Sequence, residues 1–218
     1  MENNKQTWQG IDGISEAEIT EKHSRFIASV RTITSKEDVP KLLKEIMALY
    51  PRATHYCYAY RLGVHAQDEY ASDAGEPGGT AGRPILGVLK RHGLTNTLLV
   101  VTRYFGGVKL GVPGLIAAYG EAAEAGIAAS SVATFTMGRH LLIECQYDMA
   151  KTVRTTLLKS GVKEALIKTE WGETVTFHVT VLSSVTRNIE ESFREFIARK
   201  TLLYFEWLEE MQCNLHEV

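Results

Sequence analysis

The sequence predicts an α+β protein of two domains, at about residues 1–132 and 133–218. Three observations lead to this prediction. The 218 residues exceed the roughly 100–150 of a typical single domain. Strand-like and helix-like patterns both recur along the whole chain. A run of small and β-branched residues at 130–134 separates an alanine-rich helical pattern from a new alternation, so the domain boundary is expected there.

The first domain is expected to hold four strands, at 14–19, 25–33, 55–62 and 97–104. The last of these, TLLVVTRY, predicts a buried central strand because its apolar run is short and β-branched. Helices are expected to follow Ser35 as far as Leu49, and at 81–92 and 113–129. Ser35 and Thr80 are the expected N-caps of the first two. Residues 63–80 show no period and are expected to form a long loop, which inside a compact domain is usually functional or disordered.

The second domain shows a strand, a helix, two strands, a helix and a strand. The expected ranges are 140–146, 149–160, 163–169, 173–182, 184–198 and 204–211. This β-α-β-β-α-β order is typical of the ferredoxin-like fold.

The charge pattern is more informative than the net charge of −2, which excludes a strongly basic nucleic-acid binder. No Asp or Glu occurs from Pro77 to Gly120, whereas five basic residues do: Arg83, Lys90, Arg91, Arg103 and Lys109. This segment is either a surface that faces an anion or a chance gap over helix and loop surface.

The three cysteines lie far apart and match neither a zinc site nor a disulfide framework, which favours a reducing cytoplasm. The polar start MENNKQTWQG is not expected to be a signal peptide. No apolar run is long enough for a membrane span. We expect no metal and no cofactor.

Two glycine-rich segments flank the predicted central strand, SDAGEPGGTAGRP at 72–84 and TRYFGGVKLG at 102–111. Glycine permits tight turns and close approach to a partner, and a glycine turn that leads into a helix start can hold an anion. The candidate anion- or RNA-binding residues are Arg83, Arg103, Lys109 and Arg61. The candidate loop-shaping residues are Asp73, Gly75, Glu76, Gly78, Gly79, Thr80, Gly82, Gly106, Gly107, Gly111 and Gly114.

Other chemistries have weaker support. Asp73 and Glu76 are a candidate acid–base or Mg²⁺ pair, although such loop carboxylates more often cap turns and helices. His55 and Cys57 share one face of a strand, yet a small buried thiol is expected there rather than a nucleophile. Three tyrosines of the same strand point to the other side, either into the core or towards bases: Tyr56, Tyr58 and Tyr60.

The strings SDAGEPGGTAGRPIL and VVTRYFGGVKLGVPGL, together with SRFIA at 24–28 and the ATH…YAY pattern at 53–60, resemble the N-terminal domain of the IMPACT (YigZ-like) family. The resemblance spans about residues 20–130. It implies a βαβ fold like domain IV of elongation factor G, a ferredoxin-like second domain as in bacterial members, and a role in translation. The chain departs from the family pattern at Pro113 and Ala117, where a glycine and an arginine are usual.

The first hypothesis is therefore a non-enzymatic, cytoplasmic regulator of translation. Its expected partner is RNA, the ribosome or a translation factor, with no membrane and no specific DNA sequence involved. Asp73 and Glu76 are expected to orient loop donors. The alternative is an enzyme that acts on a small phosphorylated compound or nucleotide at the same glycine-rich cleft. A scaffold that binds only protein is a third interpretation.

Overall fold

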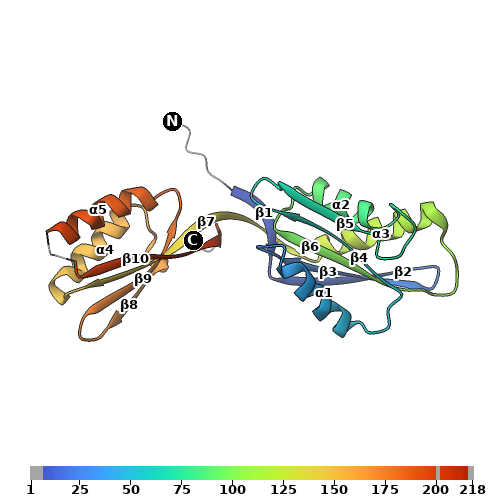
Figure 1. Ribbon diagram of the computed structural model, residues 1–218, viewed down its shortest axis with the longest axis horizontal. Helices are drawn as coiled ribbons and strands as arrows, with labels where there is room; N and C mark the ends of the chain where they lie inside the picture. Colours follow the sequence, from blue (N-terminus) through green and yellow to red (C-terminus); the bar gives the residue numbers. More distant parts are fainter. Residues whose placement is uncertain (1–6, 200–201, 216–218) are drawn as a thin grey trace. The chain divides into compact units, whose positions relative to one another are not determined.

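The computed structural model describes residues 7–199 and 202–215, which form two compact units (Figure 1). The N-terminal unit runs from Trp8 to Thr134, and the second takes up the chain from Phe135. Each unit has its own sheet and its own helices, which confirms the α+β class. The residues 1–6 that begin the polar N-terminal stretch lie outside the described residues.

The N-terminal unit contains a five-stranded antiparallel sheet in the order β2-β3-β6-β4-β5. The strands are β2 (Ile14–Glu21), β3 (Ser24–Thr32), β4 (His55–Leu62), β5 (Asp68–Ser72) and β6 (Thr97–Tyr104). β6 lies in the middle, and seven of its eight residues are buried. The prediction of a buried central strand at 97–104 is confirmed.

Helices cover both faces of this sheet (Figure 1). Leu98 and Val100 of β6 pack with α1 (Asp38–Leu49) on one face. Leu99 and Val101 point to the other face and pack with α2 (Gly82–Arg91) and α3 (Gly111–Ala128). Alternate side chains of β6 therefore pack into two hydrophobic cores, one on each face of the sheet. The three tyrosines of β4 lie on the face covered by α1.

The two predicted N-caps are wrong, because neither Ser35 nor Thr80 caps a helix through its side chain. The Asp38 carboxylate accepts hydrogen bonds from the N–H groups of Thr34 and Ser35 instead. The Thr80 hydroxyl donates to the carbonyl of Pro77. The Thr34 and Ser35 N–H groups precede α1, so the Asp38 carboxylate orders the chain that leads into the helix and does not cap its first turn.

Two strands escaped prediction, β1 (Thr7–Asp12) and β5. β5 lies inside the segment expected to be an irregular loop, pairs only with β4 and carries Asp68 and Glu69. An edge strand with charged side chains lacks the apolar alternation that predicts strands. β1 lies beside the start of β7, where Gln9 Nε2 donates to Thr134 Oγ1 at 2.8 Å.

The second unit contains β7 (Ser131–Cys145), α4 (Ala150–Lys159), β8 (Ile167–Trp171), β9 (Val175–Leu182), α5 (Thr186–Ala198) and β10 (Tyr204–Asn214). Its antiparallel strands lie in the order β10-β7-β9-β8. A short 3-10 turn at Glu164–Leu166 replaces the start of the strand expected at 163–169. β7 starts nine residues earlier than expected, since its first part belongs to the N-terminal unit.

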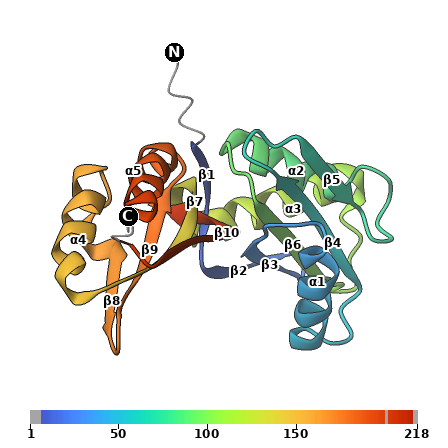
Figure 2. The ribbon, with the colours of Figure 1, turned by 60° about the vertical axis from the view of Figure 1, so that its left-hand side comes forward.

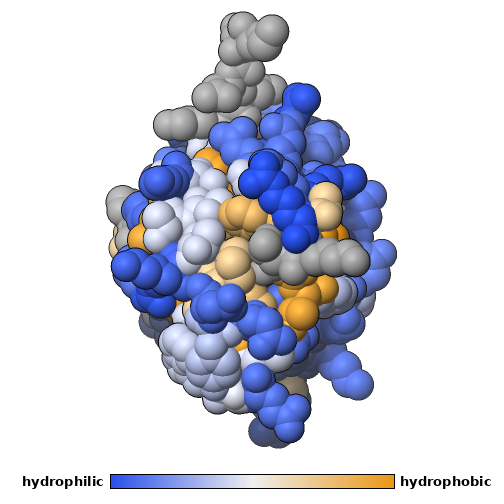
Figure 3. Space-filling model, turned by 90° about the vertical axis from the view of Figure 1, so that its left-hand side faces the viewer, coloured by the Kyte–Doolittle hydropathy of each residue, from blue (hydrophilic) through white to orange (hydrophobic). Residues whose placement is uncertain are grey.

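α4 and α5 lie on one face of this sheet and enclose a core that includes Val153, Phe177 and Phe193 (Figure 2). The face of this unit seen in Figure 3 is mostly hydrophilic, with apolar residues exposed near the middle of the view. No helix of the described residues lies on the other face of the sheet (Figure 2). On this face β9 presents Thr176, His178 and Thr180. Among the described residues no helix combines the length and apolar character needed to cross a membrane.

Two glycines of α3 are expected to respond oppositely to alanine. A Cβ at Gly126 would lie 2.8 Å from Ala28 Cβ on β3, whereas a Cβ at Gly120 would meet nothing within 4 Å. Gly126→Ala should lower the free energy of unfolding by about 1–3 kcal/mol through overpacking. Gly120→Ala should raise it by about 0.5–1 kcal/mol through helix propensity. Urea unfolding measures both, and equal effects of the two would contradict this packing.

Candidate functional site

The two glycine-rich segments meet at one end of the N-terminal sheet, where β4 begins and β6 ends. His55 of β4 is paired with Arg103 of β6 there, and the segment from Phe105 to Leu110 leads into α3. The cleft between them has a volume of about 470 Å³. Its lining residues are Thr54, His55, Glu76, Pro77, Arg103, Phe105, Lys109, Leu110, Gly111, Val112 and Leu115.

A buried ion pair forms the floor of this cleft. Arg103 Nη1 donates to Glu76 Oε1 at 2.5 Å, and the side chains are only 6% and 4% exposed. The Tyr119 hydroxyl of α3 donates to the same oxygen at 2.8 Å. The Arg103 guanidinium also lies over the rings of Phe26 and Phe105, at 5.3 and 5.4 Å from their centroids. Opposite charge, hydrogen bonds and aromatic faces lower the cost of burying the two ions, although Arg103 Nε has no hydrogen-bond partner among the described residues.

His55 lies at the edge of the floor. Its Nδ1 is 2.9 Å from the carbonyl oxygen of Ala74, which can only accept, so Nδ1 carries the proton. Its Nε2 faces Glu76 Oε1 at 3.9 Å, too far for a hydrogen bond. Nε2 of the neutral ring is thus an acceptor near the cleft. This tautomer follows from the hydrogen-bond partner of the other nitrogen.

Cys57 lies deeper on the same face of β4 and has no sign of reactivity. Its Sγ donates to the carbonyl of Asp73 at 2.9 Å and lies 3.3 Å from the Tyr119 hydroxyl. Burial raises the pKa of the Cys57 thiol to about 12, and the nearby Glu76 acts in the same direction. Because the thiolate is the nucleophile, this cysteine is inert at neutral pH.

Asp73 holds the first glycine-rich segment in shape. Its carboxylate accepts hydrogen bonds from the N–H groups of Gly79, Ala81 and Gly82, at 2.8 to 2.9 Å. Burial opposes ionisation, but these N–H groups outweigh it, so the pKa of Asp73 is lowered. The N-terminus of α2 is capped in this way from nine residues earlier in the chain.

Two glycines allow the loops to approach neighbouring backbone. A Cβ at Gly82 would lie 2.7 Å from the backbone nitrogen of Ser72, and one at Gly106 only 2.1 Å from the carbonyl of His23. Both positions therefore exclude any larger residue. Gly106 brings the second segment against the β2–β3 turn.

The four candidate anion-binding residues lie in different environments. Arg103 is buried and paired with Glu76, so its charge is already balanced. Arg61 pairs with Glu69 at the opposite end of β4, six residues or roughly 20 Å from His55. Arg83 and Lys109 are exposed and take part in none of the ion pairs between described residues. Only Lys109 of the four is an exposed cation on the cleft.

Sequence reasoning missed three residues at this end of the sheet. Tyr119, the single aromatic residue of α3, anchors Glu76, and its position in an alanine-rich helix was the one available signal. Lys22 in the β2–β3 turn and Arg52 before β4 are exposed cations without an ion pair among the described residues. No sequence pattern connects them with Lys109, because they lie far apart in the chain.

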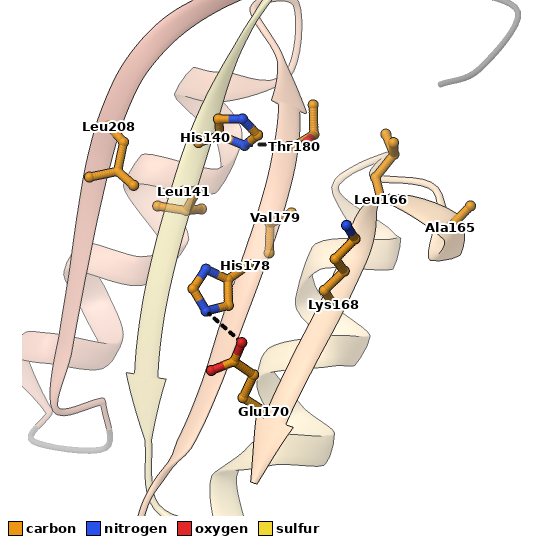
Figure 4. Close-up of a pocket in the computed structure, with 10 residues that line it drawn as sticks. All are labelled: His140, Leu141, Ala165, Leu166, Lys168, Glu170, His178, Val179, Thr180 and Leu208. Atoms are coloured by element: carbon orange, nitrogen blue, oxygen red, sulfur yellow. Dashed lines mark hydrogen bonds and ion pairs between the residues drawn. The ribbon is translucent and has the colours of Figure 1, made fainter. Parts of the chain in front are cut away.

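A second hollow, of about 570 Å³, lies on the open face of the C-terminal sheet (Figure 4). His178 Nε2 faces Glu170 Oε1 at 3.5 Å, and His140 Nδ1 lies 3.5 Å from the Thr180 hydroxyl. Lys168 is the one permanent cation of its lining, and Glu170 is beside it (Figure 4). This face offers no excess of positive charge. In neither hollow do three His, Cys, Asp or Glu side chains of described residues come together to hold a metal.

Comparison with known proteins identifies relatives over most of the chain. The family model "Impact N-terminal domain" matches residues 22–127. "IMPACT family member YvyE" of Bacillus subtilis is 34% identical over 186 residues, which cover 85% of each chain. "IMPACT family member YigZ" of Escherichia coli is 32% identical and covers 62% of this chain and 68% of its own. A crystal structure of a hypothetical protein superposes with a TM-score of 0.64 at 26% identity, over 93% of this chain and 96% of that one.

Removing one partner of the buried pair should be far more costly than removing a surface pair. Arg103→Met leaves Glu76 buried without a counter-charge, so the free energy of unfolding should fall by about 3–5 kcal/mol. Arg103→Met/Glu76→Gln should recover a large part of this loss. Arg25→Met, which breaks an exposed pair with Glu18, serves as the control and should cost at most about 1 kcal/mol. Equal losses for Arg103→Met and Arg25→Met would contradict the buried pair.

Asp73 should also contribute to the loss of stability in acid. Since the pKa of Asp73 is lowered in the folded protein, its carboxylate stabilises above the unfolded value of about 3.9, and this stability disappears as the pH falls through the folded value. Asp73→Asn should cost about 1 kcal/mol at neutral pH and flatten the decline below about pH 4. Urea unfolding from pH 2 to 7 tests this, with Glu45→Gln on the exposed side of α1 as the control. An unchanged acid limb in Asp73→Asn would contradict the assignment.

Proposed function

This chain belongs to the IMPACT family, and we propose that it is a cytoplasmic, non-enzymatic regulator of translation that binds ribosomal RNA. The family supplies the link to translation. We assign binding to the N-terminal domain, at about 1–132. We also propose that this domain has a fold like that of domain IV of elongation factor G. The domain at about 133–218 is proposed to be ferredoxin-like, in keeping with its strand order β10-β7-β9-β8.

The observation that carries the proposal is the set of exposed cations at one end of the N-terminal sheet. Lys22, Arg52 and Lys109 come from three separate segments, and none has an ion pair among the described residues. Gly106 packs against His23, so the Lys109 segment lies beside the turn that carries Lys22. Tyr104 donates to the carbonyl of Pro51, which places Arg52 near the end of β6. Unpaired cations contribute the salt-dependent part of RNA binding.

The proposed phosphate contacts differ from those expected from the sequence. Arg103 is replaced in this role by Lys22 and Arg52, because its guanidinium is committed to Glu76. Arg61 is replaced for the same reason, since Glu69 and the Leu94 carbonyl hold it. We call Lys22, Arg52 and Lys109 the cationic rim.

A second candidate is an enzyme that acts on a small phosphorylated compound. The observation that favours it is His55 Nε2 beside Glu76 at the floor of the cleft. The inert thiol of Cys57 gives this candidate no nucleophile at the floor. Turnover of a phosphorylated compound that ceases in His55→Ala would favour the enzyme over the RNA-binding protein.

Co-sedimentation with ribosomes across a salt series tests the proposed function. Wild type should bind at low salt, and three phosphate contacts predict that log K falls with log salt at a slope of about −2 to −3. Lys22→Ala/Arg52→Ala/Lys109→Ala should weaken binding and flatten the slope, since all three side chains are exposed and the fold is kept.

Lys41→Ala/Lys44→Ala/Lys159→Ala removes the same charge from exposed sites on α1 and α4 and should bind as wild type does. Binding that ignores salt, or that survives in the rim variant, would refute the RNA surface. Binding to a ribosomal protein rather than to RNA would appear as retention after nuclease treatment.

A further inference from the structure

The floor of the N-terminal cleft holds a carboxylate oxygen without a partner. Arg103 and Tyr119 both donate to Glu76 Oε1, which leaves Oε2 with no hydrogen bond among the described residues. The Glu76 side chain is 4% exposed and lines the cleft. Because Glu76 lines the cleft and its Oε2 accepts no hydrogen bond from a described residue, a ligand that donates an N–H to this oxygen gains a charge-assisted hydrogen bond.

His55 adds a second acceptor beside the first. Its Nδ1 is used by the Ala74 carbonyl, so Nε2 of the neutral ring accepts, and it lies 3.9 Å from Glu76 Oε1. Two neighbouring acceptors select a ligand with two neighbouring donors. They also disfavour an anion at the floor, because the Glu76 charge already balances Arg103.

The walls are apolar and one of them is aromatic. Pro77, Leu110, Val112 and Leu115 line the cleft together with Phe105. The Phe105 ring lies over the Arg103 guanidinium and remains 46% exposed. A ring held in place by a buried guanidinium is a platform on which a planar group can stack. The volume of about 470 Å³ suffices for one base.

The mouth of the cleft suits a phosphate. α3 begins at Gly111, and no side chain caps its first N–H groups. Lys109 is exposed two residues before, and both line the cleft. Unpaired N–H groups, the helix dipole and a lysine attract an anion at the mouth, whereas the floor takes donors.

We propose that this cleft binds one unpaired guanine of an RNA strand, with its Watson–Crick edge on Glu76 and His55, its face on Phe105 and its phosphate at Lys109 and the start of α3. Guanine presents N1–H and N2–H side by side, which matches the two acceptors. Uracil presents one N–H between two carbonyl oxygens, and these would face Glu76 and His55. The inference rests on the proposed function, since it names the nucleotide that the RNA-binding domain selects.

Fluorescence anisotropy with two labelled hexamers tests the inference, one of six uridines and one with a single central guanosine. Wild type should bind the guanosine hexamer about tenfold or more tightly than the uridine hexamer. Phe105→Ala should remove this difference, because stacking on the exposed ring is lost. His55→Ala should reduce it, whereas Lys109→Ala should weaken both hexamers about equally.

Tyr70→Ala and Lys44→Ala are the matched controls. Tyr70 is an aromatic residue of β5 that is 50% exposed, and Lys44 is an exposed lysine of α1. Neither lines the cleft, so both variants should keep the preference for guanosine. The thermal midpoints of all variants establish that each is folded.

Two failures can be told apart. Equal affinity for both hexamers in wild type, or a preference that survives in Phe105→Ala, overturns the guanine site even where ribosome co-sedimentation holds. Absence of both hexamer binding and ribosome binding at low salt overturns the proposed function as well. Both proposals are supported if wild type prefers the guanosine hexamer and if, among the variants, only Phe105→Ala and His55→Ala lose or reduce this preference.

Discussion

The ion pair between Glu76 and Arg103 holds together the end of the N-terminal unit at which the cleft lies. It joins the first glycine-rich segment to the end of β6, and Tyr119 ties α3 to the same carboxylate oxygen. Each ion is buried, so removal of one leaves the other as an uncompensated buried charge, which is strongly destabilising. The pair thus fixes three segments at one point. It also decides that the floor of the cleft is electrically balanced and presents acceptors instead of free positive charge.

Glycine contributes to this arrangement mainly through close packing. At Gly82 and Gly106 the backbone lies against Ser72 and His23 at distances that no side chain permits. These contacts bring both glycine-rich segments against the sheet. Glycines offer no side chain to hold the first segment in place. The Asp73 carboxylate holds it instead by accepting hydrogen bonds from three backbone N–H groups. The shape of the loops is therefore set by the Asp73 carboxylate and by the close backbone contacts that glycine permits at positions 82 and 106.

Charge at this end of the molecule is divided between two roles. Arg103 and Glu76 are buried and serve structure, whereas Lys22, Arg52 and Lys109 remain exposed and are available to a partner. The net charge of −2 conceals this division. The open face of the C-terminal sheet lacks a comparable surplus, since Lys168 lies beside Glu170 (Figure 4).

The sequence by itself determined the α+β class, the central strand β6, the strand β4 and the helix α3, because short apolar runs and helical periods are local properties. It also located both glycine-rich segments. It missed β5, whose charged edge residues hide the alternation. Only the tertiary structure decided that Arg103 is buried, since its partner lies 27 residues away, and that Tyr119 reaches Glu76 across 43 residues. Contacts between residues far apart in the chain decide which charges are neutralised and which stay exposed. Patterns of neighbouring residues in the sequence do not predict such contacts.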